Sequence, residues 1–286
     1  MVTGNKTAFQ VLKTDPALTA AKARESVALV SFSPWDFSAA LIGGLSETAV
    51  SLLAHHHWPE PLEGDLLYEK YDDCLHQLPY RLDHSQRIEA IFDFRKFALL
   101  PQSLYEQGKG PEMLSYTAHL QKGEQVYVDQ WGPSEAVLAY SLPASLVTWF
   151  HKRFQAGRFR QQGSAMHQLY QQFTRRGTFA LLHISTGRAD LMLARDGKLL
   201  FYNQYSYQVE EDILYFVLFA MEQFNLLPTE IVLFLSGKSL RGEKLYQLLE
   251  NYLAEVQEIP LPEQPARGDF LANREWSQQI HLLGAL

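Results

Sequence analysis

A run of short apolar segments in the second half of the chain constrains the fold more than any other feature. Segments 178–185, 189–195 and 198–205 each have the length and hydrophobicity of a β-strand. Asp196-Gly197, between the last two segments, is a dipeptide favoured in two-residue hairpin turns. We therefore predict a three-stranded antiparallel meander in this region.

A helix and a buried strand are predicted after the meander. Residues 210–224 begin with three acids, which the helix dipole favours in a first turn, and their centre, 213–221, is apolar all round. We expect that centre to be buried on most sides. Residues 230–235 have the apolar, β-branched character of a buried strand. Ser239 is then expected to cap a helix whose apolar positions continue at helical spacing to Val256.

The first half of the chain repeats this plan after a polar lead-in, residues 1–24. Ala28 to Ser33 align without a gap with Ala180 to Ser185, 152 positions later. The expected elements are strands 26–33, 37–42, 47–54 and 88–94 and a helix 66–78 with Asp65 as its N-cap. Either a domain was duplicated, or two amphipathic hairpins merely look alike. We expect two domains, 1–175 and 176–286, each a mixed sheet flanked by helices.

Composition narrows the class of protein. The chain has 286 residues, with 25 Lys and Arg against 32 Asp and Glu, so its net charge of −7 excludes a globally basic nucleic-acid binder. Its one cysteine, Cys74, cannot form a disulfide within the chain, which fits a reducing compartment. The longest stretch without a charged residue, 136–151, is shorter than a membrane span and includes Pro143. We see no secretory signal, and we expect a soluble cytoplasmic protein that does not insert into membranes.

A family resemblance rests on three segments of the second half: 199–205, 210–216 and 232–237. They resemble a bacterial family of unknown function with an actin-like ATPase fold, similar in outline to the actin-like proteins of pilus assembly and type II secretion. The resemblance covers about residues 177–259, and the first half matches by layout only. It implies an α/β fold of the actin-like, or ribonuclease-H-like, kind with two domains. It implies no particular substrate.

Actin-like ATPases hold the phosphates with two glycine-bearing turns, bind Mg²⁺ through an acid at the first turn, and use a glycine pair near the adenosine. The first turn here, Ser33-Pro34-Trp35-Asp36, has no glycine, and Pro34 lacks an N–H. No acid lies on strand 26–33, and Asp36 follows the turn, where the usual geometry does not place the metal ligand. The sequence therefore departs from the catalytic pattern.

The second half keeps more of a phosphate site. Its first turn is Ser185-Thr186-Gly187, and His183 just before it stands where an acid is expected. Its late turn is Ser236-Gly237-Lys238-Ser239, in which Lys238 replaces the second glycine. The candidate nucleotide- or phosphate-binding residues are Ser185, Thr186, Gly187, Gly237, Lys238 and Ser239. The structural alternative is that Gly237 only closes a turn and Ser239 only caps a helix. We nevertheless note that Lys238 beside a helix N-terminus would suit an anion.

Two other motifs are weaker. Of His55-His56-His57, only His55 and His57 share a face of a strand, so we predict a solvated strand end and no metal site. Cys74 lies on an apolar helical face without a histidine beside it, so we predict a buried, inert thiol.

Residues 136–189 contain no Asp or Glu but seven basic residues, with phenylalanines between them. This basic stretch could face an anionic partner, or it could be a solvated surface whose phenylalanines pack in the core. The candidate anion-binding residues are Lys152, Arg153, Arg158, Arg160, Arg175 and Arg176, and Arg188 completes the stretch.

The leading hypothesis from the sequence is a degenerate actin-like protein that binds or scaffolds a protein partner and has no catalytic residues and no cofactor. The first alternative is an active nucleotide-binding ATPase or kinase-like enzyme with a modified phosphate site, using ATP and magnesium. The second is an anion- or nucleic-acid-binding protein that uses the basic stretch, although we do not expect nucleic acid as a partner.

Overall fold

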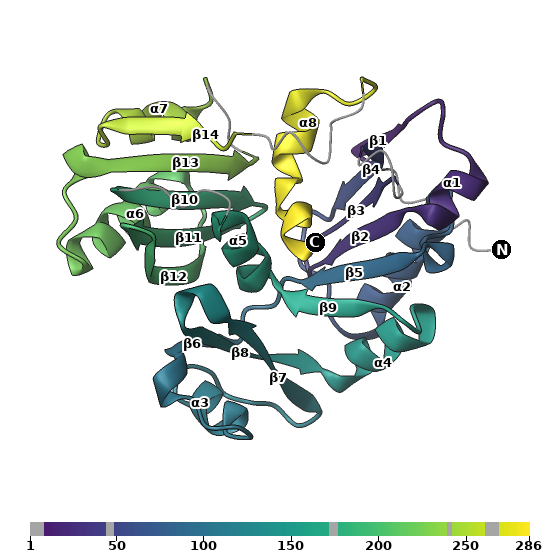
Figure 1. Ribbon diagram of the computed structural model, residues 1–286, viewed down its shortest axis with the longest axis horizontal. Coiled ribbons are helices and arrows are strands. Elements are labelled where there is room, and N and C mark those ends of the chain that lie inside the picture. The colour runs from purple at the N-terminus through teal and green to yellow at the C-terminus, as the bar shows by residue number, and fades with distance from the viewer. Residues whose placement is uncertain (1–8, 44–48, 172–176, 239–241, 261–268) are drawn as a thin grey trace.

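The computed structural model describes residues 9–43, 49–171, 177–238, 242–260 and 269–286 (Figure 1). Within these residues the strands form three sheets, of six, five and three strands. The two larger sheets lie beside each other, and the three-stranded sheet lies below them in the view of Figure 1. This mixed α/β architecture confirms the predicted fold class.

The six-stranded sheet has the order β1-β4-β3-β2-β5-β9. Strands β2, β3 and β4 form an antiparallel meander, β5 pairs in parallel with β2, and β9 pairs in parallel with β5. Strand β1 adds an antiparallel edge next to β4. The strands are β1 (Val11–Thr14), β2 (Val27–Phe32), β3 (Asp36–Ile42), β4 (Val50–His57), β5 (Arg87–Phe92) and β9 (Arg158–Gln161).

The five-stranded sheet has the order β12-β11-β10-β13-β14. Its antiparallel meander is the one predicted from the sequence, and β13 pairs in parallel with β10. The strands are β10 (Thr178–Ser185), β11 (Arg188–Arg195), β12 (Lys198–Ser206), β13 (Ile231–Gly237) and β14 (Glu255–Glu258).

The two large sheets follow one plan, as predicted. In each, a meander is followed by a helix, a parallel strand, a second helix, a further parallel strand and a third helix. The three helices are α2 (Gly64–Gln77), α4 (Ala144–Arg153) and α5 (Gln162–Gln171) in the first half, and α6 (Glu210–Gln223), α7 (Lys244–Glu250) and α8 (Asn273–Gln278) in the second.

The three-stranded sheet is an insertion in the first half, between β5 and α4. Its antiparallel order is β6-β8-β7. It consists of β6 (Phe97–Pro101), β7 (Glu124–Trp131) and β8 (Ala136–Pro143), with α3 (Gly110–Ser115) alongside. The remaining short elements are α1 (Ala20–Glu25), η1 (Leu82–His84), η2 (Gln102–Leu104), η3 (Gly132–Ser134), η4 (Pro228–Glu230) and η5 (Ile280–Ala285).

The last helical segments of the two halves cross between the sheets. Tyr170 of α5 stacks on Phe179 of β10, with ring centroids 5.4 Å apart. In the other direction, η5 packs against β2, β3 and β5 and belongs to the same apolar core. Figure 1 shows this C-terminal segment between the two large sheets. The division at residues 175 and 176 remains a prediction, and the chain crosses it in both directions through these contacts.

Two predicted helix starts were wrong. Helix α7 begins at Lys244 after Glu243, and Val256 pairs with Leu233 in strand β14. The apolar spacing alone fits a longer helix, but parallel pairing with β13 overrides it. Ser239 lies outside the described residues. Helix α2 begins at Gly64, with the residue before it as N-cap, so the predicted cap at Asp65 was also wrong.

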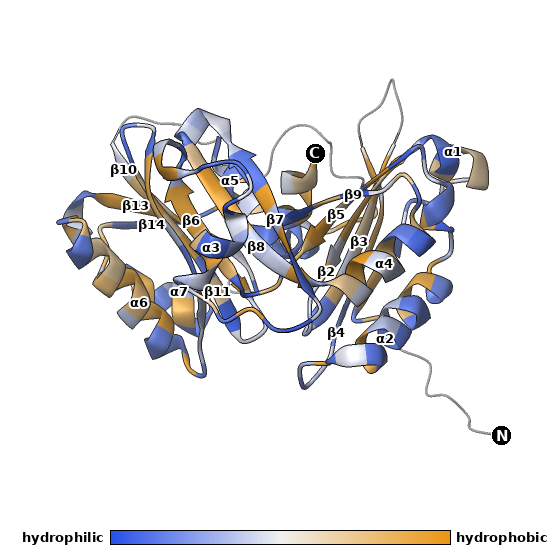
Figure 2. Cartoon of the chain, turned by 90° about the horizontal axis from the view of Figure 1, so that it is seen from below, coloured by the Kyte–Doolittle hydropathy of each residue, from blue (hydrophilic) through white to orange (hydrophobic). Residues whose placement is uncertain are grey.

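Two further predictions were wrong. No strand or helix was expected in the lead-in, residues 1–24, but strand β1 lies there and helix α1 begins there, because β4 offers β1 a partner that the weak local pattern does not reveal. The apolar centre of α6 is buried on one side only: Tyr215 is 60% exposed and Phe219 is 44% exposed. Helix α6 lies at the outer edge of the molecule in Figure 2, covering one face of a single sheet.

Candidate functional site

Two hairpin turns face each other across the cleft between the large sheets. One joins β2 to β3 through Pro34 and Trp35, and the other joins β10 to β11 through Thr186 and Gly187. A Cβ atom built on Gly187 would lie 3.9 Å from the indole ring of Trp35, so the turns are in van der Waals reach. These are the turns to which the sequence assigned a phosphate site.

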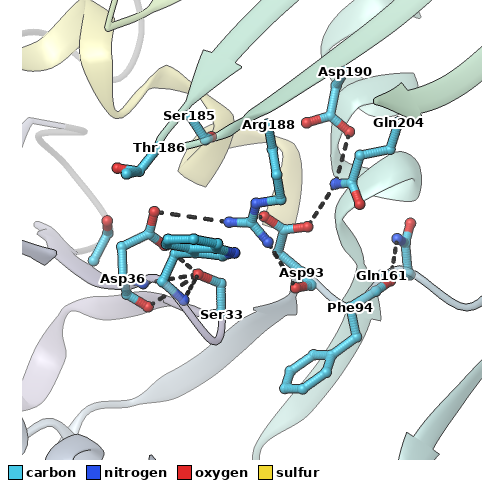
Figure 3. Close-up of polar contacts among 12 residues, drawn as sticks. Ser33, Asp36, Asp93, Phe94, Gln161, Ser185, Thr186, Arg188, Asp190 and Gln204 are labelled. Atoms are coloured by element: carbon cyan, nitrogen blue, oxygen red, sulfur yellow. Dashed lines mark hydrogen bonds and ion pairs between the residues drawn. The ribbon is translucent and has the colours of Figure 1, made fainter. Parts of the chain in front are cut away.

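Arg188, the first residue of β11, occupies the space between the turns. It is 2% exposed, and its Nη2 lies 2.6 Å from Oδ2 of Asp93 and 3.8 Å from Oδ2 of Asp36. Its Nη1 also donates to the backbone oxygen of Asp93 at 3.1 Å. Figure 3 shows the guanidinium between the two carboxylates. Burial alone would lower the pKa of Arg188, but the two carboxylates raise it, so the guanidinium is charged.

The network continues from Asp93 into the second sheet. Gln204 donates through Nε2 to Asp93 at 2.7 Å and to Asp190 at 3.3 Å, and the hydroxyl of Tyr202 donates to Asp190 at 2.7 Å. Burial and the nearby charge of Asp93 raise the pKa of Asp190 to about 7. Burial raises the pKa of Asp93 too, against the opposing effect of Arg188. The cleft thus has one buried cation among three carboxyl groups.

The first turn satisfies its own backbone donors. The hydroxyl oxygen of Ser33 accepts hydrogen bonds from the N–H groups of Trp35 at 3.1 Å and Asp36 at 2.9 Å. The same hydroxyl donates to the Asp36 carboxylate at 2.6 Å. Since Pro34 has no N–H, the turn offers a phosphate no unpaired donor from these residues.

The second turn is more open. Ser185, Thr186 and Gly187 are half-buried, and Nζ of Lys238 contacts the hydroxyl of Thr186. Burial lowers the pKa of Lys238, an effect that Asp36 opposes. Gly237 has a φ of 89°, and a Cβ there would lie 2.1 Å from the backbone oxygen of Ile184, so only glycine fits.

The structure therefore brings together five of the six candidate phosphate-binding residues. They meet because β10 and β13 are parallel neighbours whose carboxyl ends lie at the same edge of the sheet. The sixth, Ser239, lies outside the described residues. Because α7 begins at Lys244, Lys238 does not lie beside the helix N-terminus that the sequence suggested.

The cavity between the turns is small. Its volume is about 20 Å³, which is room for about one water molecule. Asp36, Asp93, Ser185 and Lys238 line it together with residues of β2, β3, β4, α5 and the C-terminal segment. A nucleotide does not fit in this arrangement of side chains.

Three buried histidines lie at or next to the cavity: His55 and His281 line it, and His183 contacts His281. Nδ1 of His55 lies 3.0 Å from the Ser38 hydroxyl, which donates to Gln279 at 2.7 Å. Nδ1 of His183 lies 2.9 Å from the Ser236 hydroxyl, and the rings of His183 and His281 are 5.0 Å apart.

Burial lowers the pKa of all three rings: to about 4 for His55, to about 3 for His281, and well below the usual value for His183. All three are therefore neutral at pH 7. The predicted solvated strand end at residues 55–57 was wrong for His55, because β4 continues through His57 and turns His55 toward the core. No group of three His, Cys, Asp or Glu residues in the described part of the chain could hold a metal ion.

The structure confirms the prediction that the Cys74 thiol is buried. The thiol is fully buried on the inner face of α2, and burial raises its pKa to about 12. A thiol in this environment stays protonated and unreactive.

The described residues of the basic stretch have separate surroundings. Lys152 and Arg158 are exposed, Arg153 lies 3.9 Å from Asp72, and Nη1 of Arg160 donates to the backbone oxygen of Gly284 at 3.1 Å. Arg175 and Arg176 lie outside the described residues. Arg188 is buried in the cleft, so its assignment to the basic stretch was wrong. Two of the phenylalanines between these residues, Phe150 and Phe154, are buried in the core.

Sequence reasoning missed the roles of Asp93 and Arg188. A signal was present: the offset of 152 that aligns the two halves also aligns Asp36 with Arg188. Asp93 and Lys238 are equivalent as well, because each follows the parallel strand of its sheet. The N–H of Asp93 donates to Phe32, and the N–H of Lys238 donates to Ile184, the residue aligned with Phe32.

The two similar sheets and the facing turns give the chain an actin-like fold, and comparisons with solved structures agree. A Bacteroides thetaiotaomicron protein with an actin-like ATPase fold and unknown function superposes with a TM-score of 0.74 at 16% identity, covering 84% of this chain and 92% of that one. A PilM–PilN type IV pilus biogenesis complex gives a TM-score of 0.63 at 14% identity, covering 92% and 96%. At these identities the likeness concerns the fold.

The chain belongs to the family described as "Protein of unknown function (DUF3822)", whose profile matches residues 17–256. A search of curated proteins found no match. The family and fold resemblance stated from the sequence is thereby confirmed. No helix in the described residues is long and apolar enough to cross a membrane.

Proposed function

We propose that this protein is an actin-like binding or scaffolding module that does not hydrolyse ATP. The observation that carries the proposal is the buried ion pair of Arg188 with Asp93, with Asp36 alongside, in the space between the two turns. In an actin-like ATPase this space would have to admit phosphates and a magnesium ion.

The charges in the cleft support this proposal. Magnesium binds through carboxylates and phosphate oxygens, and it demands near-ideal octahedral geometry. Here Arg188 already compensates the charge of Asp93 and Asp36. Admitting a triphosphate would require the separation of a fully desolvated pair, and breaking such a pair is costly. The N–H groups of the first turn are already bonded to Ser33, so they are not free to bind a phosphate and offset this cost.

A protein partner is the proposed ligand of the module. The PilM–PilN structure to which the fold is similar is itself a complex of two proteins. We place the module in the cytoplasm, where its buried Cys74 would stay reduced.

The second turn favours one alternative, the binding of an anion without hydrolysis. Lys238 and Ser185 line the cavity, and Lys238 contacts the hydroxyl of Thr186. Lysine and hydroxyl groups suit a phosphate group, and the half-buried position would strengthen the interaction. This alternative needs no magnesium and leaves Arg188 in place.

A thermal melt with and without millimolar ATP, ADP and Mg²⁺ tests the proposal. A ligand at 100 times its dissociation constant adds about 2.7 kcal/mol, which is a shift of several degrees for a chain of this size. We expect no magnesium-dependent shift. A shift with magnesium would overturn the proposal, and a shift without magnesium that Lys238→Met abolishes would favour the anion alternative. Lys22→Met, an exposed change on α1, serves as the control.

A further inference from the structure

A second pocket lies on the other side of Arg188, where the three sheets meet. It has a volume of about 210 Å³ and is lined by the β2–β3 turn, the β5–β6 connection, the ends of β7 and β8, and the start of β11. The pocket is thus ten times larger than the cavity between the turns, and it is below the usual size range for drug-sized ligands. A single ring with a short chain is the size that suits it.

The walls of the pocket are flat and apolar. Pro34 and Trp35 form one side, and Phe94 and Pro143 contribute from the other segments. Trp35 is only half-buried, and Gly187 lies beside its indole ring. Aromatic and proline surfaces favour an aromatic ring, which stacks on them with a large buried area.

Of the basic side chains that line the pocket, one has no ion-pair partner among the described residues. Lys96 is paired with Glu124 at 2.7 Å, and Arg188 is paired with Asp93 at 2.6 Å. Arg95 also lines the pocket; it is exposed and has no hydrogen bond or ion pair with any residue that the structure describes. A guanidinium in this position is a matched partner for a carboxylate, which it can hold through two parallel hydrogen bonds.

One buried polar group in the pocket lacks a partner. Ser141 is 3% exposed, and its hydroxyl makes no hydrogen bond within the described residues, although its N–H donates to the backbone oxygen of Lys96 at 3.0 Å. A buried hydroxyl without a hydrogen bond is unfavourable, so such groups usually mark a missing partner.

We propose that this pocket binds a small aromatic carboxylate, with its ring between Trp35 and Pro143, its carboxylate on Arg95 and the Ser141 hydroxyl as a second polar contact. The size of the pocket, its flat walls, the unpaired guanidinium and the unpaired hydroxyl all agree on this class of ligand. The proposal is independent of whether the neighbouring cleft binds nucleotide.

The test is a fluorescence titration of the full chain with 3-phenylpropanoate and with its neutral analogue 3-phenylpropanol. Trp35 lies in the wall, so occupancy of the pocket changes the indole emission, and Trp35→Phe removes that signal. We expect the carboxylate to bind with a dissociation constant of about 1 mM or tighter and the alcohol to bind about tenfold more weakly.

Two variants locate the interaction. Arg95→Gln should weaken the carboxylate about tenfold and leave the alcohol unchanged, whereas Arg158→Gln, an exposed change on β9, should alter neither. Ser141→Leu should block both ligands by filling the pocket, with folding checked by a thermal melt. Failure of the wild-type protein to bind either compound overturns the proposal, and equal affinity of Arg95→Gln and wild type overturns the assignment of the carboxylate.

Discussion

The two halves of the molecule share one scaffold and carry opposite charges at equivalent positions. In the first half, the meander begins its second strand with Asp36 and the parallel strand is followed by Asp93. In the second half, the equivalent residues are Arg188 and Lys238. Because the two turns face each other, the opposite charges meet: Arg188 lies against both aspartates. The cleft is therefore complementary to itself, and a ligand would have to compete with that pairing.

The two turns also differ in how they use their hydroxyls. The hydroxyl of Ser33 accepts two backbone hydrogen bonds and donates to the Asp36 side chain, whereas the hydroxyl of its counterpart, Ser185, makes no hydrogen bond with the residues that the structure describes. The first turn is thus closed by its own side chains, and the second remains half-buried beside Lys238. The comparison teaches that two halves of one fold can share their geometry and differ in their chemistry.

Acid should produce the largest effect, because both halves bury neutral histidines in and near the cleft. The pKa values of His55 and His167 fall to about 4 and that of His281 to about 3 by burial. The unfolded chain binds these protons near pH 6.5, so stability is full above that pH and is lost as pH falls toward 4. Each of the first two contributes up to about 3 kcal/mol.

Asp190 opposes this trend. Because the pKa of Asp190 is about 7 in the folded protein, the stability of the protein falls as pH rises from about 4 to 7. Burial also raises the pKa values of Asp93 and Asp129, which act in the same direction as Asp190. We expect the histidines to outweigh these carboxyl groups, so that the net loss is on the acid side. Urea melts between pH 7.5 and 4.5 measure the slope, and His281→Gln should reduce it. A flat profile over this range would contradict the assignment of neutral, buried rings.

Removal of the cation from the cleft should have the next largest effect. Arg188→Met leaves Asp93 and Asp36 without their partner in a desolvated site, and we expect a loss of about 3–5 kcal/mol in the free energy of unfolding. Arg195→Met, at the exposed end of the same strand, should cost under about 0.5 kcal/mol.

A double-mutant cycle with Asp93→Asn sharpens this comparison of the halves. If the two charges depend on each other, the double variant is more stable than the sum of the single changes predicts, by about 1 kcal/mol or more. Additive losses would mean that Arg188 and Asp93 act separately, and they would contradict the interpretation that the charges of the cleft pair with each other.

We expect position 284, where η5 packs against α5, to tolerate no side chain larger than that of glycine. A Cβ on Gly284 would lie 2.0 Å from the backbone oxygen of Ala165, so Gly284→Ala must push η5 away from α5. We expect a loss of about 1–3 kcal/mol, as for other overpacked sites. Gly132→Ala has open space around it and serves as the matched control, with no expected loss. Equal melting temperatures for the two variants would show that the crossing is loose.

The smallest effect compares the two hairpin turns directly. Ser33→Ala removes the acceptor of two N–H groups, those of half-buried Trp35 and buried Asp36, with an expected cost of about 1–3 kcal/mol. Ser185→Ala removes a half-buried hydroxyl that makes no hydrogen bond within the described part of the chain, and it should cost under about 0.5 kcal/mol. Chemical denaturation of the pair measures the difference, and a larger loss at Ser185 would reverse the account of which turn is closed.

Much of the fold was predictable where the chain pairs with its sequence neighbours. The meander over 178–205 was placed within one residue, because apolar strands and the Asp196-Gly197 turn are local signals. Strand β14 and the buried C-terminal segment were missed, because their partners lie far away in the sequence. Pairing with β13 decides the fate of Val256, and no local pattern contains that information.

The candidate site was predictable to the same extent. Ser185, Thr186 and Lys238 meet because two neighbouring parallel strands end together, which the family resemblance already implied. Arg188 was assigned to a basic surface because its neighbours in sequence are basic. Its real partner, Asp93, lies in the other half of the molecule, and only the folded structure brings the two together.

The central claim is that the cleft is closed by its own charges, and equilibrium dialysis with labelled ATP tests it most directly. The wild-type protein is dialysed against millimolar ATP with and without Mg²⁺, and the retained nucleotide is counted. We predict no retention that depends on magnesium. Stoichiometric retention of ATP in the presence of Mg²⁺, and its loss on chelation of the metal, would contradict the claim.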